Sequence, residues 1–303
     1  MAIIRVEQLS KAYPGGRGIA DVGFTVDEGE IFGILGPNGA GKTTTVECIG
    51  GLRARDGGVV DVAGFDPGSD SPGFREVLGI QLQESTLPDK IRVGEALALF
   101  ASFHDNPADA GELAERLGLA PHLAMPYGKL SGGQKQRLSV ALALIGRPRV
   151  AILDELTTGL DPQARRDVWG LLEDLRSTGV TLLLVSHFME EAQRLCDRVA
   201  VIDDGRVVAI GPPSELAERS GGGQVMVFTP SAPVDLRRLR ALASVVGVDE
   251  RGDQIRVRGG DKVVTDVIVE LRDQGVDPDH LRVDRPTLDD AFVSLVSDRK
   301  VNR

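Results

Sequence analysis

The sequence contains little of what secreted or membrane-spanning proteins need. It has only two cysteines in 303 residues, Cys48 and Cys196, which excludes a disulfide-rich scaffold. Both lie in apolar stretches that are predicted to be helical, so we expect two buried thiols, as suits a reducing cytosol. No apolar run approaches the roughly 18 residues that a membrane-spanning helix requires. The best candidates, Val180–Val185 and Ala141–Ile145, are interpreted as a buried strand and a helix face.

Basic charge is also scarce. Lysine and arginine number 35 against 45 acidic residues, which gives a formal net charge of −10. A sequence-tolerant nucleic-acid binder needs a basic face to neutralise phosphates, so we expect no nucleic-acid partner. The first ten residues alternate apolar and polar side chains without a long apolar core, which argues against a signal peptide. Any function at a membrane would therefore need membrane segments from another protein.

The sequence does contain the pattern of a globular α/β protein. Its hydrophobic fraction of 42% and charged fraction of 26% are ordinary for that class. Between Ile3 and about Gly211, short β-branched runs alternate with longer helical ones. Two runs, Val150–Leu153 and Thr181–Val185, are apolar throughout, as in parallel strands covered on both faces. A mostly helical stretch, about residues 88–145, interrupts the pattern and predicts an inserted helical subdomain.

The sheet is expected to be central and mostly parallel, with an antiparallel β edge. Asp204-Gly205 separates the apolar runs 199–202 and 207–210, which predicts a hairpin at this edge. Ser220–Gly223 predicts a flexible joint between a large first domain, residues 1–219, and a small α+β domain, residues 220–303.

The predicted second domain has six elements in the order β-α-β-β-α-β, which is that of ferredoxin-like units. Thr287 and Asp290, three residues later, are predicted to cap one further helix. The length of 303 residues agrees with one large and one small domain.

A glycine-rich loop lies between the predicted strand Ile31–Leu35 and a helix that begins near Lys42. Its residues match the P-loop pattern G-x-x-x-x-G-K-[ST]: Gly36, Pro37, Asn38, Gly39, Ala40, Gly41, Lys42 and Thr43. The glycines let backbone N–H groups close around phosphate oxygens, and the helix directs its positive end at the anion. We expect Lys42 to reach the β- and γ-phosphates of a nucleotide and the Thr43 hydroxyl to bind Mg²⁺.

Two acids end the apolar strand 150–153. Asp154, at the carboxyl end of this strand and next to the P-loop strand, is expected to hold Mg²⁺, usually through water. Glu155 points elsewhere and is expected to polarise the water that attacks the γ-phosphorus. Two acids after a strand are more often a solvated strand end, and the P-loop in the same chain is what favours catalysis.

A second glycine pair precedes an amphipathic helix from Lys135 onward. Ser131 is a natural N-cap, and Gly132 and Gly133 leave backbone N–H groups open to a ligand. Together with Gln134 they predict a second anion site at a helix N-terminus. In isolation these residues also describe an ordinary helix start. We call Ser131–Gln134 the signature segment.

These motifs together resemble those of ABC-transporter ATPases. The matching stretches are LSGGQKQR over 130–137, GPNGAGKTT over 36–44 and LDELTTGLDP over 153–162, within about residues 3–211. The resemblance implies an ATP hydrolase with ATP and Mg²⁺ as cofactors, and adds Thr44 to the ATP site. It also implies a head-to-tail homodimer in which each ATP lies between one subunit's P-loop and the other's signature segment.

The resemblance assigns roles to four further residues. Tyr13 matches the aromatic residue that stacks on adenine, although a strand-edge tyrosine can also pack locally. Gln83 matches the glutamine that contacts Mg²⁺ or water and couples to the membrane subunit, with Gln81 on the same strand face as a competitor. His187 matches the switch histidine at the γ-phosphate, where a lone histidine would otherwise be structural. Asp161 matches the loop that crosses the dimer interface.

One position departs from the family pattern. Leu156 stands where the family usually has proline after the catalytic pair, and loss of the fixed φ is expected to loosen the Glu155 loop. The tail, Arg285–Phe292, is similar to that of ATPases serving small exporters, including the drug-resistance and polyketide-antibiotic group. An ordinary capped helix is the alternative interpretation of this tail.

The leading hypothesis is therefore an ATP-hydrolysing subunit of an exporter of drugs, antibiotics or lipid-like molecules. We expect it to bind a separate transmembrane permease at the cytoplasmic face of the cell membrane. An importer or a non-transport membrane regulator could use the same cassette. A soluble ABC ATPase acting on ribosomes or DNA is a further alternative, disfavoured by a single P-loop and a single signature segment.

Overall fold

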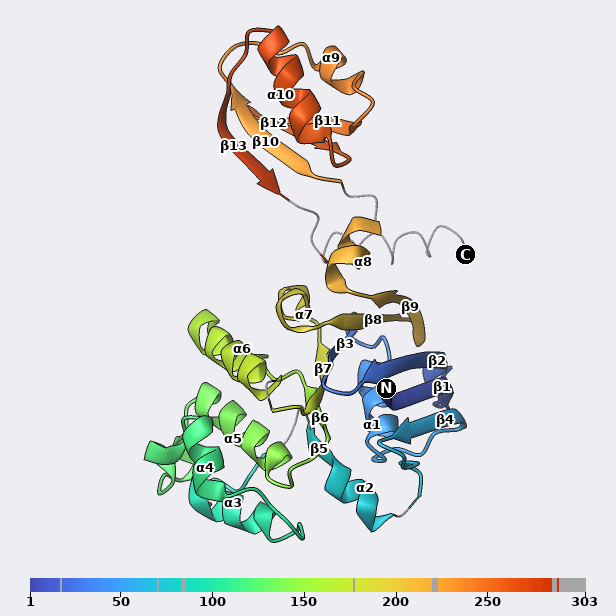
Figure 1. Ribbon diagram of the computed structural model, residues 1–303, viewed down its shortest axis with the longest axis vertical. Helices are drawn as coiled ribbons and strands as arrows, with labels where there is room; N and C mark the ends of the chain where they lie inside the picture. The colour runs from blue at the N-terminus through green and yellow to red at the C-terminus, as the bar shows by residue number, and fades with distance from the viewer. Residues whose placement is uncertain are drawn as a thin grey trace. The chain divides into compact units, whose positions relative to one another are not determined.

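The computed structural model describes residues 1–16, 18–69, 71–82, 86–176, 178–219, 223–284 and 288 (Figure 1). The chain forms two compact units, unit 1 (Met1–Pro212) and unit 2 (Pro213–Arg303). Among the described residues, no helix combines the length and the apolar character that crossing a membrane requires. Both cysteines are buried free thiols, as expected.

A six-stranded sheet forms the centre of unit 1. Its order is β5 (Leu78–Gln81), β6 (Val150–Asp154), β7 (Thr181–Ser186), β3 (Ile31–Leu35), β8 (Arg198–Asp203) and β9 (Arg206–Gly211). All neighbouring pairs are parallel except β8 and β9. Every residue of β3, β6 and β7 is buried, which explains their continuous apolar sequences. The predicted parallel sheet with an antiparallel edge is confirmed.

The prediction that Asp154 lies next to the P-loop strand is wrong in one respect. Strand β7 lies between β6 and β3, pairing Ile152 of β6 with Leu183 and Ile34 of β3 with Val185. The crossover connections of parallel strands do not reveal which strands become neighbours, so sequence order did not give sheet order. All three strands are parallel, and their carboxyl ends therefore still share one edge of the sheet.

A second, antiparallel sheet packs against the first in unit 1. It consists of β2 (Gly18–Asp27), β1 (Ala2–Ala12) and β4 (Gly57–Val62) in that order. The rings of Phe24 in β2 and Phe32 in β3 stack with centroids 5.1 Å apart, within a core built from both sheets. Helix α1 (Lys42–Ile49) contacts β1, β2, β4 and β7. The P-loop at its start is thus held by both sheets.

The segment predicted to be mostly helical is helical. It contains α3 (Val93–Ala101), α4 (Ala110–Arg116), the 3₁₀ turns η1 (Ala120–His122) and η2 (Tyr127–Lys129), and α5 (Gly132–Leu144). Helix α2 (Pro72–Val77) precedes it, and α6 (Pro162–Arg176) and α7 (Met189–Leu195) follow. Figure 1 shows α3, α4 and α5 grouped away from the antiparallel sheet. The signature segment lies at the start of α5.

The elements of unit 2 are α8 (Pro213–Arg219), β10 (Val225–Pro230), α9 (Leu236–Arg240), β11 (Val245–Arg251), β12 (Gln254–Gly259), α10 (Val263–Asp273) and β13 (Pro278–Asp284). From β10 onward, unit 2 has the predicted element order, but it also includes α8, which the predicted boundary between residues 219 and 220 placed in the first domain. The sheet order is β11-β12-β10-β13 with all neighbours antiparallel, as in a split βαβ unit. A separate core around Met226, Phe228 and Val267 holds it together. The predicted capping pair Thr287/Asp290 and the tail, apart from Leu288, lie outside the described residues.

Candidate active site

The P-loop has a backbone that only glycine fits at two positions. Gly41, the N-cap of α1, has φ 104°, and a Cβ atom there would lie 2.5 Å from Cγ2 of Ile19. A Cβ atom on Gly36 would lie 2.2 Å from the carbonyl oxygen of Ile202 in β8. The loop therefore turns tightly between the two sheets and presents its backbone N–H groups at the helix start.

Lys42 is held inside this loop. Its side chain is buried, and Nζ donates hydrogen bonds to the carbonyl oxygens of Gly36 at 2.9 Å and Pro37 at 3.2 Å. Burial lowers the pKa of Lys42, while the negative charges of Glu155 and Asp154 oppose this shift. The ammonium group thus lies at the positive end of α1 with two carboxylates in its field, an arrangement suited to a polyphosphate with a cation.

Asp154 is a buried acid with no partner for its charge. It is 1% exposed, and neither carboxylate oxygen has a hydrogen-bond partner among the described residues. Burial, and then the charge of Glu155, raise the pKa of Asp154 to about 6, against the opposing effect of Lys42. Two unsatisfied, buried carboxylate oxygens are the hard ligands that Mg²⁺ prefers, so this position fits the predicted metal.

In the described part of the chain, no cluster of protein side chains forms a metal site by itself. No group of three or more histidine, cysteine, aspartate or glutamate side chains there could hold an ion. Mg²⁺ typically keeps several waters and takes one or two carboxylates plus substrate phosphates. The buried carboxylate of Asp154 and the hydroxyl of Thr43 fit this mode of binding.

Glu155 and His187 meet at the carboxyl edge of the sheet. Nδ1 of His187, which follows β7, lies 3.1 Å from Oε1 of Glu155. The backbone N–H of Glu155 donates to the carbonyl oxygen of Val185 at 2.9 Å. Glu155 has φ 49°, and this left-handed turn separates its direction from that of Asp154. The sequence predicted the two residues individually, and the fold brings them into contact.

A first cavity joins the P-loop to Tyr13 and Glu155. It has a volume of about 520 Å³ and is lined by Tyr13, Pro14, Gly18, Asn38, Gly39, Gly41, Lys42, Thr43, Thr44 and Glu155. The hydroxyl oxygens of Tyr13 and Thr44 are 3.2 Å apart. The guanidinium of Arg53 lies over the Tyr13 ring, 5.3 Å from its centroid. Sequence reasoning missed Arg53, because only the fold brings it to the tyrosine.

A second cavity contains the signature segment and Asp161. It has a volume of about 360 Å³ and is lined by Gly118, His122, Ser131, Gly132, Gly133, Gln134, Arg137, Gly159, Leu160, Asp161, Ala164 and Asp167. Ser131 caps α5, and Oδ1 of Asp161 accepts from the backbone N–H groups of Gln163 and Ala164 at 2.9 Å each. Of the described residues, none lines both cavities. The predicted site is thus divided into two separate parts.

The sequence is similar to known ATP-binding proteins along almost its whole length. It is 33% identical over 304 residues to the linearmycin resistance ATP-binding protein LnrL of Bacillus subtilis, covering 97% of this chain and 98% of that protein. It is 34% identical over 304 residues to the daunorubicin resistance ATP-binding protein DrrA3 of Streptomyces coeruleorubidus, covering 97% and 96%. The profile of the ABC transporter family matches residues 19–158. The chain belongs to the ABC transporter family.

Within that family, this ABC ATPase is a subunit that binds and hydrolyses ATP. Among solved structures it is similar to cbiO1 of Clostridium perfringens, which is part of the ABC transporter complex cbiONQ. The TM-score is 0.63 at 29% sequence identity, covering 71% of this chain and 90% of that one.

Two glutamines of the ABC ATPase, Gln81 and Gln83, are candidates for the predicted contact with Mg²⁺ or water, and the structure describes only Gln81. Gln83 lies outside the described residues, and its role stays a prediction. Gln81 is 4% exposed, its Oε1 accepts from the backbone N–H of Asp154 at 3.1 Å, and its Nε2 donates to the carbonyl oxygen of Leu82. The amide of Gln81 is therefore used to join β5 to β6 at their carboxyl ends.

The turn after Glu155 contains the unusual Leu156. Leu156 is buried, at 3% exposure. The backbone N–H of Thr158 donates to the carbonyl oxygen of Glu155 at 3.2 Å, and its hydroxyl lies 3.4 Å from Oε2 of the same residue. Packing of Leu156 and these contacts of Thr158 hold the turn where a proline would have fixed φ. The effect of Leu156 on turnover stays a prediction.

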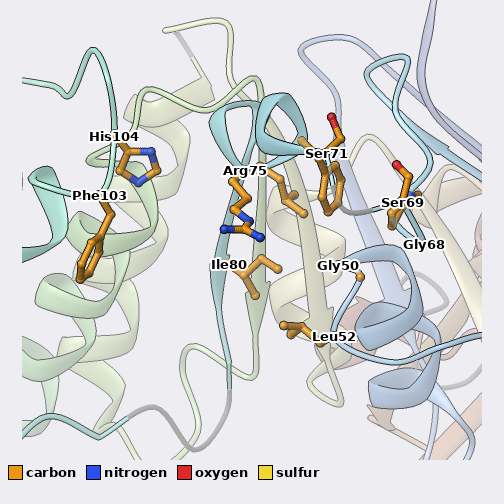
Figure 2. A pocket seen from close by; sticks show the side chains of 13 residues that line it. Gly50, Leu52, Gly68, Ser69, Ser71, Arg75, Ile80, Phe103 and His104 are labelled. Atoms are coloured by element: carbon orange, nitrogen blue, oxygen red, sulfur yellow. The ribbon is translucent and has the colours of Figure 1, made fainter.

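A third cavity of the ABC ATPase lies away from both parts of the predicted site. It has a volume of about 780 Å³ and is lined by Gly50, Gly51, Leu52, Pro67, Gly68, Ser69, Ser71, Phe74, Arg75, Leu78, Ile80, Phe103 and His104. Figure 2 shows Phe103 and His104 on one side, Arg75, Ile80 and Leu52 in the middle, and Gly68 and Ser69 on the other side. Leu52 is 55% exposed and Phe103 66%. Sequence reasoning missed this cavity, because its lining comes from separate segments.

Proposed function

We propose that this ABC ATPase drives an exporter of drug-like, antibiotic or lipid-like molecules. The observation that carries the proposal is the extent of its similarity to antibiotic-resistance ATP-binding proteins. The match to the linearmycin resistance protein covers 97% of this chain and therefore includes unit 2 as well as the cassette. The daunorubicin resistance protein matches over the same share. A shared second domain indicates a shared type of membrane partner more specifically than the cassette does.

ATP is proposed to bind in the first cavity. Tyr13 stacks on the adenine, and residues Gly36 to Thr44 surround the phosphates with backbone N–H groups. Lys42 exchanges its bonds with two loop carbonyls for bonds with the β- and γ-phosphates, because a charged oxygen is the stronger acceptor. Thr43, Asp154 and Gln83 are the residues that would hold Mg²⁺. When bound, Mg²⁺ neutralises charge that develops on the phosphates.

Hydrolysis is proposed to depend on the contact between Glu155 and His187. Glu155 accepts a hydrogen bond from the attacking water and polarises it toward the γ-phosphorus. Nδ1 of His187 donates to Oε1 of Glu155 at 3.1 Å, which holds the carboxylate in one orientation. Nε2 of His187 is not used in this contact, and in a doubly protonated ring it can donate to a γ-phosphate oxygen. Leu156 closes the turn behind the pair by packing into the core.

Dimerisation is proposed to complete each ATP site. The first cavity contains the P-loop and Glu155, whereas the second contains the signature segment and Asp161. In a head-to-tail pair, each ATP lies between the first cavity of one copy and the second cavity of the other copy. ATP then joins the two chains, and hydrolysis separates them.

A separate transmembrane permease is the proposed partner, which places this subunit at the cytoplasmic face of the membrane. We propose the third cavity as the place where the permease contacts it (Figure 2). Exposed Leu52 and Phe103, which both line this cavity, suit the apolar side of a short helix. The similar cbiO1 protein is itself part of a transporter complex.

The proposal is tested in two steps. The tagged chain, expressed at its native level, is purified from detergent-solubilised membranes, and a multi-span protein is expected with it in fixed stoichiometry. Purification with ribosomes or DNA instead contradicts a membrane partner.

A strain that lacks the gene is then tested against a panel of amphipathic antibiotics. Restoration of resistance by the wild type but not by Lys42→Ala supports export, and unchanged sensitivity to every compound contradicts it.

A further inference from the structure

The signature segment is held by a side chain from outside its own helix. Oε1 of Gln134 accepts from the backbone N–H of Ser131 at 2.9 Å, and Oγ of Ser131 accepts from the backbone N–H of Gln134 at 3.3 Å. This reciprocal pair is a capping box. Nε2 of Gln134 lies 2.9 Å from Nε2 of His122, at the end of the 3₁₀ turn η1. The imidazole therefore contacts the remaining half of the Gln134 amide.

These contacts fix both the amide and the imidazole. The backbone N–H of Ser131 can only donate, so Gln134 must present its oxygen to Ser131 and its NH₂ group to His122. An NH₂ group can also only donate, so Nε2 of His122 must accept. The contact therefore requires the tautomer of His122 that has its hydrogen on Nδ1. No other assignment of hydrogens satisfies all three contacts.

The same arrangement keeps the anion-binding groups of the signature segment available. Ser131 uses its hydroxyl oxygen as an acceptor in the capping box, so its hydroxyl hydrogen can donate to a ligand. Gly132 and Gly133 are the first two residues of α5, and their N–H groups have no carbonyl within the helix to bond. His122 lines the same 360 Å³ cavity as these three residues.

We propose that His122 is a positioning residue for the composite ATP site. It acts through Gln134, by holding the amide whose oxygen fixes Ser131, and it does not contact ATP. The inference rests on the proposed function, in which the signature segment receives the γ-phosphate of the partner's ATP. Without the imidazole, the Gln134 side chain is free to rotate, and the N-terminus of α5 loses part of its cap. The loss weakens dimer closure but not ATP binding to the P-loop.

The experiment measures ATP-driven dimerisation in chains that carry Glu155→Gln to prevent hydrolysis. Sedimentation with Mg-ATP is compared with the binding of a fluorescent ATP analogue to the monomer. His122→Ala is expected to weaken dimerisation about fivefold for each of the two sites, the effect of about one hydrogen bond. Analogue binding is expected to stay unchanged, and the melting temperature is expected to fall by no more than about 2–4 °C.

Two conservative variants and one control make the test specific. His122→Gln places an amide oxygen near the position of Nε2 and is expected to restore dimerisation. His122→Asn places its oxygen near the position of Nδ1 and is expected not to restore it. His280→Asn changes an exposed histidine of unit 2 and is expected to leave both measurements unchanged.

Three results would overturn the inference. The first is equal dimerisation with and without His122→Ala. The second is equal restoration by His122→Gln and His122→Asn. The third is a melting temperature that falls in parallel with dimerisation in all His122 variants, because that result shows a structural role alone. If the Glu155→Gln chain with His122 intact forms no ATP-dependent dimer, the proposed function fails, and the inference fails with it.

Discussion

At the residue scale, the contact between Glu155 and His187 links two residues that are 32 positions apart. A carboxylate that polarises water typically contributes a factor of about 10² to 10⁴ to a rate. Glu155→Gln is therefore expected to lower the ATP hydrolysis rate by at least about 100-fold while ATP still binds. Phosphate release measures the rate, and equilibrium binding of radiolabelled ATP measures retention. Hydrolysis by this variant at the wild-type rate would falsify the role of Glu155.

Asp154 gives a pH-dependent prediction. Its folded-state pKa of about 6 exceeds the ordinary value of 3.8, so the folded protein binds this proton more tightly than the unfolded chain does. Stability therefore falls as pH rises from about 4 to about 6, by about 1.4 kcal/mol per unit of pKa difference. Asp154→Asn is expected to remove this penalty, of about 3 kcal/mol at pH 8, about 1 kcal/mol at pH 4.5 and near zero below about pH 3.

The measurement is urea unfolding of both proteins without nucleotide or metal, at pH 4.5 and pH 8. We expect Asp154→Asn to be more stable than the wild type by about 3 kcal/mol at pH 8 and by only about 1 kcal/mol at pH 4.5. Mg-ADP is expected to stabilise the wild type more than the variant. Equal stability of the two proteins at pH 8 would contradict the prediction, because it would show that the ionised, buried carboxylate of Asp154 does not destabilise the folded protein.

At the element scale, the β8–β9 turn supports the P-loop. The backbone N–H of Gly205 donates to the carbonyl oxygen of Ala40 at 2.9 Å, and its carbonyl oxygen accepts from the backbone N–H of Ala20 at 2.8 Å. Gly205 has φ 71°, and a Cβ atom there would lie 2.2 Å from the carbonyl oxygen of Gly18. A hairpin turn thus joins the P-loop to strand β2.

Gly205→Ala is expected to weaken ATP binding as well as stability. A non-glycine residue at positive φ costs about 1–2 kcal/mol, and the clash with Gly18 must also move one of the two segments. The matched control is Gly252→Ala in the β11–β12 turn, which has φ 64° but open space at the Cβ position. ATP binding is measured by titration calorimetry. If both substitutions leave ATP affinity unchanged, the turn does not support the P-loop.

The strands that carry the site could be predicted from the sequence, but the pairing between these strands could not. The apolar sequences of β3, β6 and β7 predicted buried parallel strands, and these strands are buried throughout. The sequence could not show that β7 separates β6 from β3, because pairing between distant strands leaves no local pattern. For the same reason the bond from Asp154 to the amide of Gln81 was not foreseen.

The residues of the candidate site also fall into two groups, those that a local motif predicts and those that only the fold brings together. The P-loop residues, Asp154 and Ser131 belong to short motifs whose spacing carries a mechanism, so the sequence could predict them. Arg53 and His122 have no such motif, and only the folded chain brings them to Tyr13 and Gln134. The third cavity was missed because its lining comes from several separate segments.

At the scale of the whole molecule, each unit has a hydrophobic core of its own. Separate cores predict two thermal transitions rather than one. Mg-ADP binds unit 1 in the proposed function, so it is expected to raise only the transition of unit 1, by mass action. Scanning calorimetry with and without Mg-ADP tests this expectation. One transition that moves as a whole would show that the units unfold together.

The division of the candidate site between two cavities has a genetic consequence. A chain with Lys42→Ala keeps a sound signature segment, and a chain with Ser131→Arg keeps a sound P-loop. In the proposed head-to-tail dimer, neither variant forms an intact site with itself, but a mixed pair forms one. Two inactive alleles in one cell are therefore expected to complement each other, and random pairing leaves about a quarter of all sites intact. ATP hydrolysis by the mixture, absent from either variant alone, would show that each site belongs to two chains.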